Sequence, residues 1–218
     1  MDDFDRQWVD LVERVEWIET LYALIGLTRI GERPTTVERL AATLERPKEE
    51  AIDLAWQGSR VRPEDGLIEL VTPWPGASPR RKLRIGEREL PVSGCAPDLF
   101  GVAAVVDVPF RVEDTCAVTG TPIRIGFASG AVESADPPET VAVLLPPAEA
   151  NTIDDMDVEQ VNTDLCVLQP FFASAQAAQG WLDDHPGGRV YGMDDMASRP
   201  FVAYMRDNWR PRILANLE

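Results

Sequence analysis

Apolar side chains recur at alternating intervals of four and three residues through the first part of the chain. Positions with this spacing lie on one face of an α-helix, because the helix turns once every 3.6 residues. The pattern therefore predicts one continuous helix that buries this face. The stripe consists of Phe4, Trp8, Leu11, Val15, Ile18, Tyr22 and Ile25.

Two shorter helices and a hairpin are expected next. Thr35 can accept a hydrogen bond from the backbone and Glu38 can reach back to it, which is the signature of a capping box at a helix start. Pro47 suits the first turn of a third helix, and the helical pattern stops near Gly58. Residues 61–71 then predict a small hairpin.

Three helices followed by a hairpin that turns at Asp65-Gly66 form the outline of a winged helix, so a DNA-binding regulator is one possible function. The third helix would then be the recognition helix. It begins with Lys48-Glu49-Glu50 and continues with Asp53, whereas residues that enter a DNA groove are typically Arg, Lys, Asn or Gln. The charge pattern favours a structural or partner-binding unit instead.

The segment 72–79 is rich in proline and glycine, which is typical of a connector. We therefore expect a winged-helix-like N-terminal unit over 1–75 and a second unit over 80–218. Short apolar runs predict strands in the second unit, with short helices between them in no regular alternation. The expected fold class is α+β with a mixed or antiparallel sheet. The predicted strands are a hairpin over 83–92 around Gly86, then 110–112, 123–127 and 141–145, and the predicted helices are 97–106, 174–182 and 199–209.

Composition and charge narrow the function. The chain has 218 residues, of which 44% are hydrophobic, and this is enough to bury a substantial core. A formal charge of -16 repels phosphate backbones and argues against nucleic-acid binding. No apolar run is long enough to span a bilayer and the first residues are acidic, so we expect no membrane association and a cytoplasmic location. The single histidine, His185, excludes metal sites built from several histidines of one chain.

The three cysteines are widely spaced and do not form a closed disulfide framework. Pro97 suits a helical first turn, so Cys95 is expected at a helix N-terminus, where backbone N–H groups favour the thiolate. Asp98 lies one turn away and its charge opposes the thiolate, so the two groups titrate together, which suits general-acid catalysis. By their surroundings alone, Cys116 is interpreted as a small buried hydrophobe and Cys166, in an apolar stretch of strand character, as core.

Taken together, the cysteines and their neighbours resemble the organomercurial (alkylmercury) lyases in order and local sequence. The resemblance covers most of the chain after the connector and is fainter before it. The sequence departs from the family pattern at Gly94, where an aromatic residue is expected, and after Cys166, where a further cysteine and a histidine are absent. The resemblance rests on Gly94-Cys95-Ala96-Pro97-Asp98, on 115–123 around Cys116, and on Cys166 followed by Phe171-Phe172-Ala173-Ser174 and Trp181.

The resemblance implies roles for four residues. Cys95 and Cys166 would be the thiolates that bind substrate and product mercury, with Asp98 beside the same metal as the third catalytic group. Cys116 would be a structural cysteine. The implied reaction is protonolysis of a carbon–mercury bond, which gives a hydrocarbon and Hg(II) held by two thiolates, the ligands that a soft metal prefers. It implies no resident cofactor, external small thiols that remove the product, and mercuric reductase as an onward partner.

Besides an enzyme and a DNA-binding regulator, the cysteines are compatible with a third function. A protein that sequesters organometals or soft metals would use the same two sulfur atoms without turnover. The oligomeric state is open.

Overall fold

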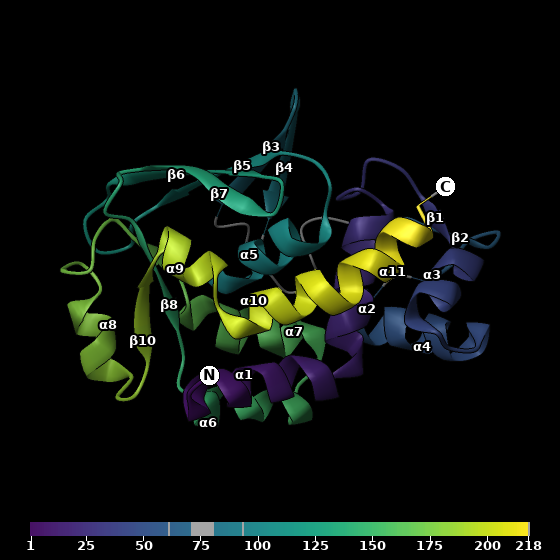
Figure 1. Cartoon of the computed structure of the whole chain (residues 1–218), viewed down its shortest axis with the longest axis horizontal. Coiled ribbons are helices and arrows are strands. Elements are labelled where there is room, and N and C mark those ends of the chain that lie inside the picture. Colours follow the sequence, from purple (N-terminus) through teal and green to yellow (C-terminus); the bar gives the residue numbers. More distant parts are fainter. Residues whose placement is uncertain (61, 71–80, 93, 218) are drawn as a thin grey trace.

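The computed structural model describes residues 1–60, 62–70, 81–92 and 94–217. The predicted connector over 72–79 lies outside the described residues, and the division into units 1–75 and 80–218 stays a prediction. The described residues combine helices with antiparallel sheets (Figure 1), which confirms the expected α+β class.

The N-terminal apolar stripe lies on two helices, so the prediction of one continuous helix is wrong. Helix α1 (Asp3–Arg14) ends and helix α2 (Glu16–Leu27) begins on either side of Val15, whose φ of -91° and ψ of 87° are not helical. The whole stripe is nevertheless buried. The break carries no glycine or proline, and the apolar spacing continues across it, so the sequence pattern gives no sign of it.

The next two helices lie close to their predicted positions. Helix α3 (Val37–Leu44) is capped by Thr36, whose hydroxyl accepts from the Arg39 backbone N–H at 3.2 Å. The predicted cap, Thr35, instead belongs to strand β1 (Thr35–Thr36), which pairs with β2 (Leu67–Ile68). Helix α4 (Lys48–Ser59) follows Pro47 as expected.

The predicted turn at Asp65-Gly66 is present, and both residues have positive φ, 51° and 78°. Across this turn, the described pairing between the two arms of the predicted hairpin is a bridge between Glu64 and Leu67. Strand β2 pairs instead with β1. The winged-helix description of this unit stays a prediction.

The larger sheet within the described residues has five antiparallel strands in the order β4-β3-β5-β6-β7. The predicted hairpin and the next two predicted strands are confirmed, to within a few residues at their ends. Strand β7 escaped prediction because most of its side chains are exposed and it has no apolar alternation. The bounds are β3 (Arg81–Ile85), β4 (Arg88–Val92), β5 (Phe110–Thr115), β6 (Pro122–Ala128) and β7 (Ala131–Asp136).

A smaller antiparallel sheet, in the order β10-β8-β9, stands beside the larger one (Figure 1). Its central strand β8 (Val141–Leu144) is fully buried and matches the predicted strand at 141–145. Its neighbours are β9 (Phe171–Phe172) and β10 (Arg189–Gly192), which are too short for a clear sequence pattern.

Among the remaining helices, α5 (Ala96–Val105) and α9 (Met193–Ala197) contact both sheets, and α5 also packs against α2. The helix predicted at 174–182 is confined to α8 (Gln179–Asp184), and the one predicted at 199–209 continues as one helical run to residue 215. No helix of the described residues is long and apolar enough to cross a membrane. The other helical segments are α6 (Pro147–Ala150), η1 (Asn151–Asp155), α7 (Val158–Gln160), η2 (Val161–Leu165), η3 (Cys166–Leu168), α10 (Pro200–Tyr204), η4 (Met205–Trp209) and α11 (Arg210–Ala215).

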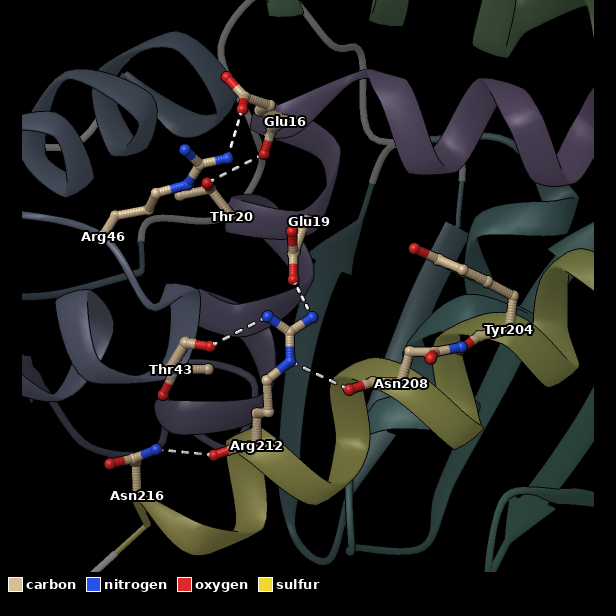
Figure 2. Close-up of polar contacts among 9 residues, drawn as sticks. All are labelled: Glu16, Glu19, Thr20, Thr43, Arg46, Tyr204, Asn208, Arg212 and Asn216. Carbon is tan, nitrogen blue, oxygen red and sulfur yellow. Dashed lines mark hydrogen bonds and ion pairs between the residues drawn. The ribbon is translucent and has the colours of Figure 1, made fainter.

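The C-terminal helix α11 is tied to the N-terminal helices by the guanidinium of Arg212 (Figure 2). This group donates to the carboxylate of Glu19 on α2, to the Thr43 carbonyl at 3.5 Å and to the Asn208 carbonyl at 3.1 Å. Burial raises the pKa of Glu19, although the positive charge of Arg212 acts to lower it. The contacts hold α2 against the C-terminal part of the chain, and α2 supplies a residue to the site described below.

The packing of α2 against α4 yields the first testable prediction. A Cβ added at Gly58 would lie 2.6 Å from the Trp17 carbonyl oxygen, whereas one added at Gly180 would meet nothing within 4 Å. We expect Gly58→Ala to lower the free energy of unfolding by about 2 kcal/mol, because the helices must move apart. Gly180→Ala should raise it by up to about 1 kcal/mol through helix propensity. Urea unfolding of both variants checks the pair, and equal effects would contradict the packing described.

Candidate active site

The first cysteine begins helix α5. Cys95 is the N-cap residue, with φ -86° and ψ 167°, and its backbone N–H donates to Asp98 Oδ2 at 2.6 Å. Pro97 lies in the first turn, where its missing N–H costs nothing. The expected position of Cys95 at a helix N-terminus is therefore confirmed.

Asp98 is the only polar residue of α5, whose other residues are all buried. Its carboxylate has contacts on both oxygens. Oδ2 accepts from the Cys95 backbone and faces the Cys166 sulfur at 3.7 Å, while Oδ1 accepts from the Tyr22 hydroxyl at 3.2 Å. Asp98 is half-buried, and these donors replace the water that its carboxylate has lost.

The second cysteine lies on a turn rather than a strand, so the strand character predicted around Cys166 is wrong. The π-helical turn η2 leads directly into the 3₁₀ turn η3, which Cys166 begins. Gln169 anchors this turn: its carbonyl accepts from the Ala96 N–H at 2.8 Å, and its side-chain oxygen accepts from the Leu145 N–H at 3.0 Å. The turn is thereby joined to the start of α5 and to the end of β8.

These contacts bring three residues that are distant in sequence into one cluster. Ligand atoms of Cys95, Asp98 and Cys166 all lie within 4.8 Å of one another. The two cysteines are 6% and 8% exposed, so water reaches them poorly. They border a cavity of about 80 Å³. Its apolar lining includes Trp8, Leu11, Val12, Ile18, Leu145, Ile153, Val161, Leu165, Phe201 and Met205.

Cys116 stands apart from this cluster of described residues. It is 1% exposed and begins a turn in which its carbonyl accepts from the Gly120 N–H at 2.8 Å. Burial opposes its ionisation, but hydrogen bonds from the Thr119 hydroxyl and from backbone N–H groups outweigh burial and lower the pKa of Cys116.

The electrostatics of the cluster favour the neutral forms of two groups. Burial raises the pKa of the Cys95 thiol well above its ordinary value, and its contacts with Cys166 and the negative charge of Asp98 add to the effect. Burial, followed by the charges of Asp98 and Cys95, also raises the pKa of Tyr22 well above its ordinary value. The helix N-terminus and the charge of Asp98 were expected to act on the Cys95 thiol in opposite directions, and in the structure burial and the negative neighbours outweigh the helix N-terminus.

A buried arginine supports the backbone just before Cys95. Gly94 has φ +102°, a conformation that disfavours any side chain. Its carbonyl accepts from Arg81 Nη1 at 3.1 Å, and Arg81 also pairs with Asp114 at 3.0 Å and lies over the Phe171 ring. This conformation accounts for a glycine where the family resemblance predicted an aromatic residue.

Three supporting residues were missed by the sequence reasoning. Tyr22 was counted only as part of the apolar stripe, and nothing in the local sequence of Arg81 or Gln169 signals a contact with the cysteine segments. Tyr22 is 76 residues from its partner Asp98 along the chain, and Gln169 is 24 residues from its partner Leu145. Only the folded chain reveals such contacts.

Fold and cluster together define a class: an α+β protein with two buried thiols and a carboxylate that border an apolar cavity, a set that suits a soft metal. The alkylmercury lyase family model matches residues 82–198, which is more than half of the chain. This chain belongs to the alkylmercury lyase family.

Individual relatives agree with that assignment. The chain is similar to the alkylmercury lyase of Bacillus cereus, at 29% identity over 174 residues, covering 76% of this chain and 72% of the relative. It is 28% identical to the alkylmercury lyase of Streptomyces lividans over 165 residues, covering 75% and 72%. The crystal structure of the mercury-bound form of MerB2 has the same fold, with a TM-score of 0.58 at 16% identity, covering 97% and 98% of the two chains.

The buried ion pair behind Cys95 yields a prediction with a matched control. Arg81 and Asp114 have side chains 1% and 9% exposed, whereas the pair Arg14–Asp154 is 40% and 48% exposed. Arg81→Met should lower the free energy of unfolding by about 3 kcal/mol or more, because it leaves a buried carboxylate unpaired. Arg14→Met should cost less than about 1 kcal/mol. Equal losses in denaturant titrations would contradict the described burial of Arg81.

Proposed function

We propose that this protein cleaves the carbon–mercury bond of organomercurials by protonolysis. One observation carries the proposal: Cys95, Cys166 and Asp98 converge within 4.8 Å beside an apolar cavity in a member of the alkylmercury lyase family. Sulfur is the donor that a soft metal prefers, and the cavity can take an apolar organic group.

The first step exchanges a ligand on mercury. A cysteine thiol forms a sulfur–mercury bond, the thiol proton passes to Asp98, and the substrate's original anionic ligand leaves. Cys95 starts this step as a neutral thiol, since its pKa is raised. Asp98 is placed to accept a proton, because Oδ2 lies 3.7 Å from the Cys166 sulfur and accepts from the Cys95 backbone.

The second step breaks the carbon–mercury bond. Donation from two sulfurs increases the electron density on the bound carbon, which keeps the bond's electron pair and takes the proton held by Asp98. The second thiol gives its proton to the carboxylate that this transfer regenerates as its sulfur binds mercury, and Asp98 then releases this proton to water, which balances the anionic ligand that left in the first step. The products are a hydrocarbon and Hg(II) bound to Cys95 and Cys166, and no atom is oxidised or reduced.

Turnover requires removal of the bound Hg(II). External small thiols can exchange with the two cysteines, and each gives its proton back to a protein sulfur as its own sulfur binds mercury. We propose no resident cofactor, and a mercuric reductase as the onward partner. Cys116, outside the cluster and 1% exposed, is proposed to be structural.

The proposal predicts hydrocarbon release from phenylmercury or methylmercury under excess small thiol. Benzene or methane, measured by gas chromatography, should form catalytically with the unaltered protein. Asp98→Asn and Cys166→Ser should each lower kcat by about a hundredfold or more, since each loses a reacting group. Cys116→Ala, checked for folding by circular dichroism, is the matched cysteine control and should keep its activity.

Other outcomes would overturn the proposal. Mercury binding without hydrocarbon would indicate a sequestering protein. Full activity in Cys166→Ser would remove the second sulfur from the mechanism.

A further inference from the structure

The site has a polar contact from the N-terminal helices that the proposed reaction leaves unexplained. Tyr22 lies on α2, outside the residues 82–198 that match the family model, yet its side chain borders the same cavity as the two cysteines. The residue is 4% exposed. A buried hydroxyl at this position requires an acceptor, and its acceptor is Asp98.

The two carboxylate oxygens of Asp98 have different partners. The Tyr22 hydroxyl donates to Oδ1 at 3.2 Å and lies 3.4 Å from the Asp98 carbonyl oxygen. Oδ2 instead faces the Cys166 sulfur at 3.7 Å. One oxygen is therefore held from the N-terminal side, while the other faces the thiol with which it exchanges protons.

The Tyr22 ring is itself held in place. A Cβ on Gly101 would lie 2.7 Å from the Tyr22 hydroxyl oxygen and 2.8 Å from two ring carbons, so the ring fills the space that this glycine leaves on α5. The Trp209 ring packs on Tyr22 with a centroid distance of 5.7 Å. A ring packed on two sides can hold the carboxylate in one orientation.

We propose that Tyr22 is a positioning residue, whose hydroxyl holds Asp98 Oδ1 so that Oδ2 stays directed at the thiols during proton transfer. The inference rests on the proposed lyase function and gives the N-terminal unit a part in it. Tyr22 neither binds mercury nor carries the transferred proton. Its removal should therefore affect the chemical step and spare metal binding.

Tyr22→Phe tests this role, with Tyr204→Phe as the matched control. Tyr204 packs on the same Trp209 ring at 5.7 Å but shows no contact with Asp98 among the described hydrogen bonds. In Tyr22→Phe, kcat for benzene release from phenylmercury should fall about tenfold, in keeping with one lost hydrogen bond to a charged group. KM and the binding of Hg(II), titrated by its sulfur–mercury absorbance, should change less than twofold. Tyr204→Phe should match the unaltered protein in all three.

A second variant keeps the inference testable if Tyr22→Phe fails to fold. Gly101→Ala keeps the hydroxyl but displaces the ring, and it should lower kcat in the same way. Unchanged kcat in a folded Tyr22→Phe would overturn this inference alone, as would a parallel loss of kcat and Hg(II) binding, which indicates a structural role. Absence of benzene from the unaltered protein would overturn the lyase proposal and this inference with it.

Discussion

A half-buried carboxylate on an otherwise apolar helix costs free energy unless hydrogen-bond donors replace the water that it has lost, and in this protein that requirement falls on Asp98. Its partners come from three separate parts of the chain: the Cys95 backbone, the Tyr22 hydroxyl and the Cys166 thiol. The groups that satisfy the carboxylate are thus the groups that form the site. Stability and function depend on the same contacts.

The surrounding fold fixes the positions of those partners. Gln169 joins the turn that carries Cys166 to the start of α5, and Arg81 holds the carbonyl of Gly94 next to Cys95. On the other side, Arg212 ties α2 to the C-terminal helix (Figure 2). The site is consequently enclosed by elements from both ends of the chain, which limits the access of water to the thiols.

Patterns local in sequence predicted much of the fold. The α5 start was predictable because Pro97 and Asp98 are characteristic of a first helical turn, and the strands of the larger sheet followed from apolar alternation. The break at Val15 and the turn around Cys166 were not predictable from sequence. The apolar side chains continue through both segments without a change of pattern, so the local sequence does not mark either feature. Strand β7 carries too few buried side chains to show a pattern.

The candidate site was predictable only as a set of residues. Spacing and resemblance selected Cys95, Asp98 and Cys166, but neither could show that Cys95 is a neutral thiol at rest, since its raised pKa depends on burial among distant neighbours. Tyr22 lay within an apolar stripe and had the character of core. Its contact with Asp98 depends on how α2 packs against α5, which no local pattern encodes.

The most direct test of the account is a single turnover of methylmercury in D₂O without external thiol, followed by mass spectrometry of the gas. The account predicts one methane per protein chain, carrying one deuterium, because the proton comes from exchangeable groups and Hg(II) then stays on Cys95 and Cys166. Methane without deuterium, or no methane from a protein that binds the substrate, would contradict protonolysis at this site.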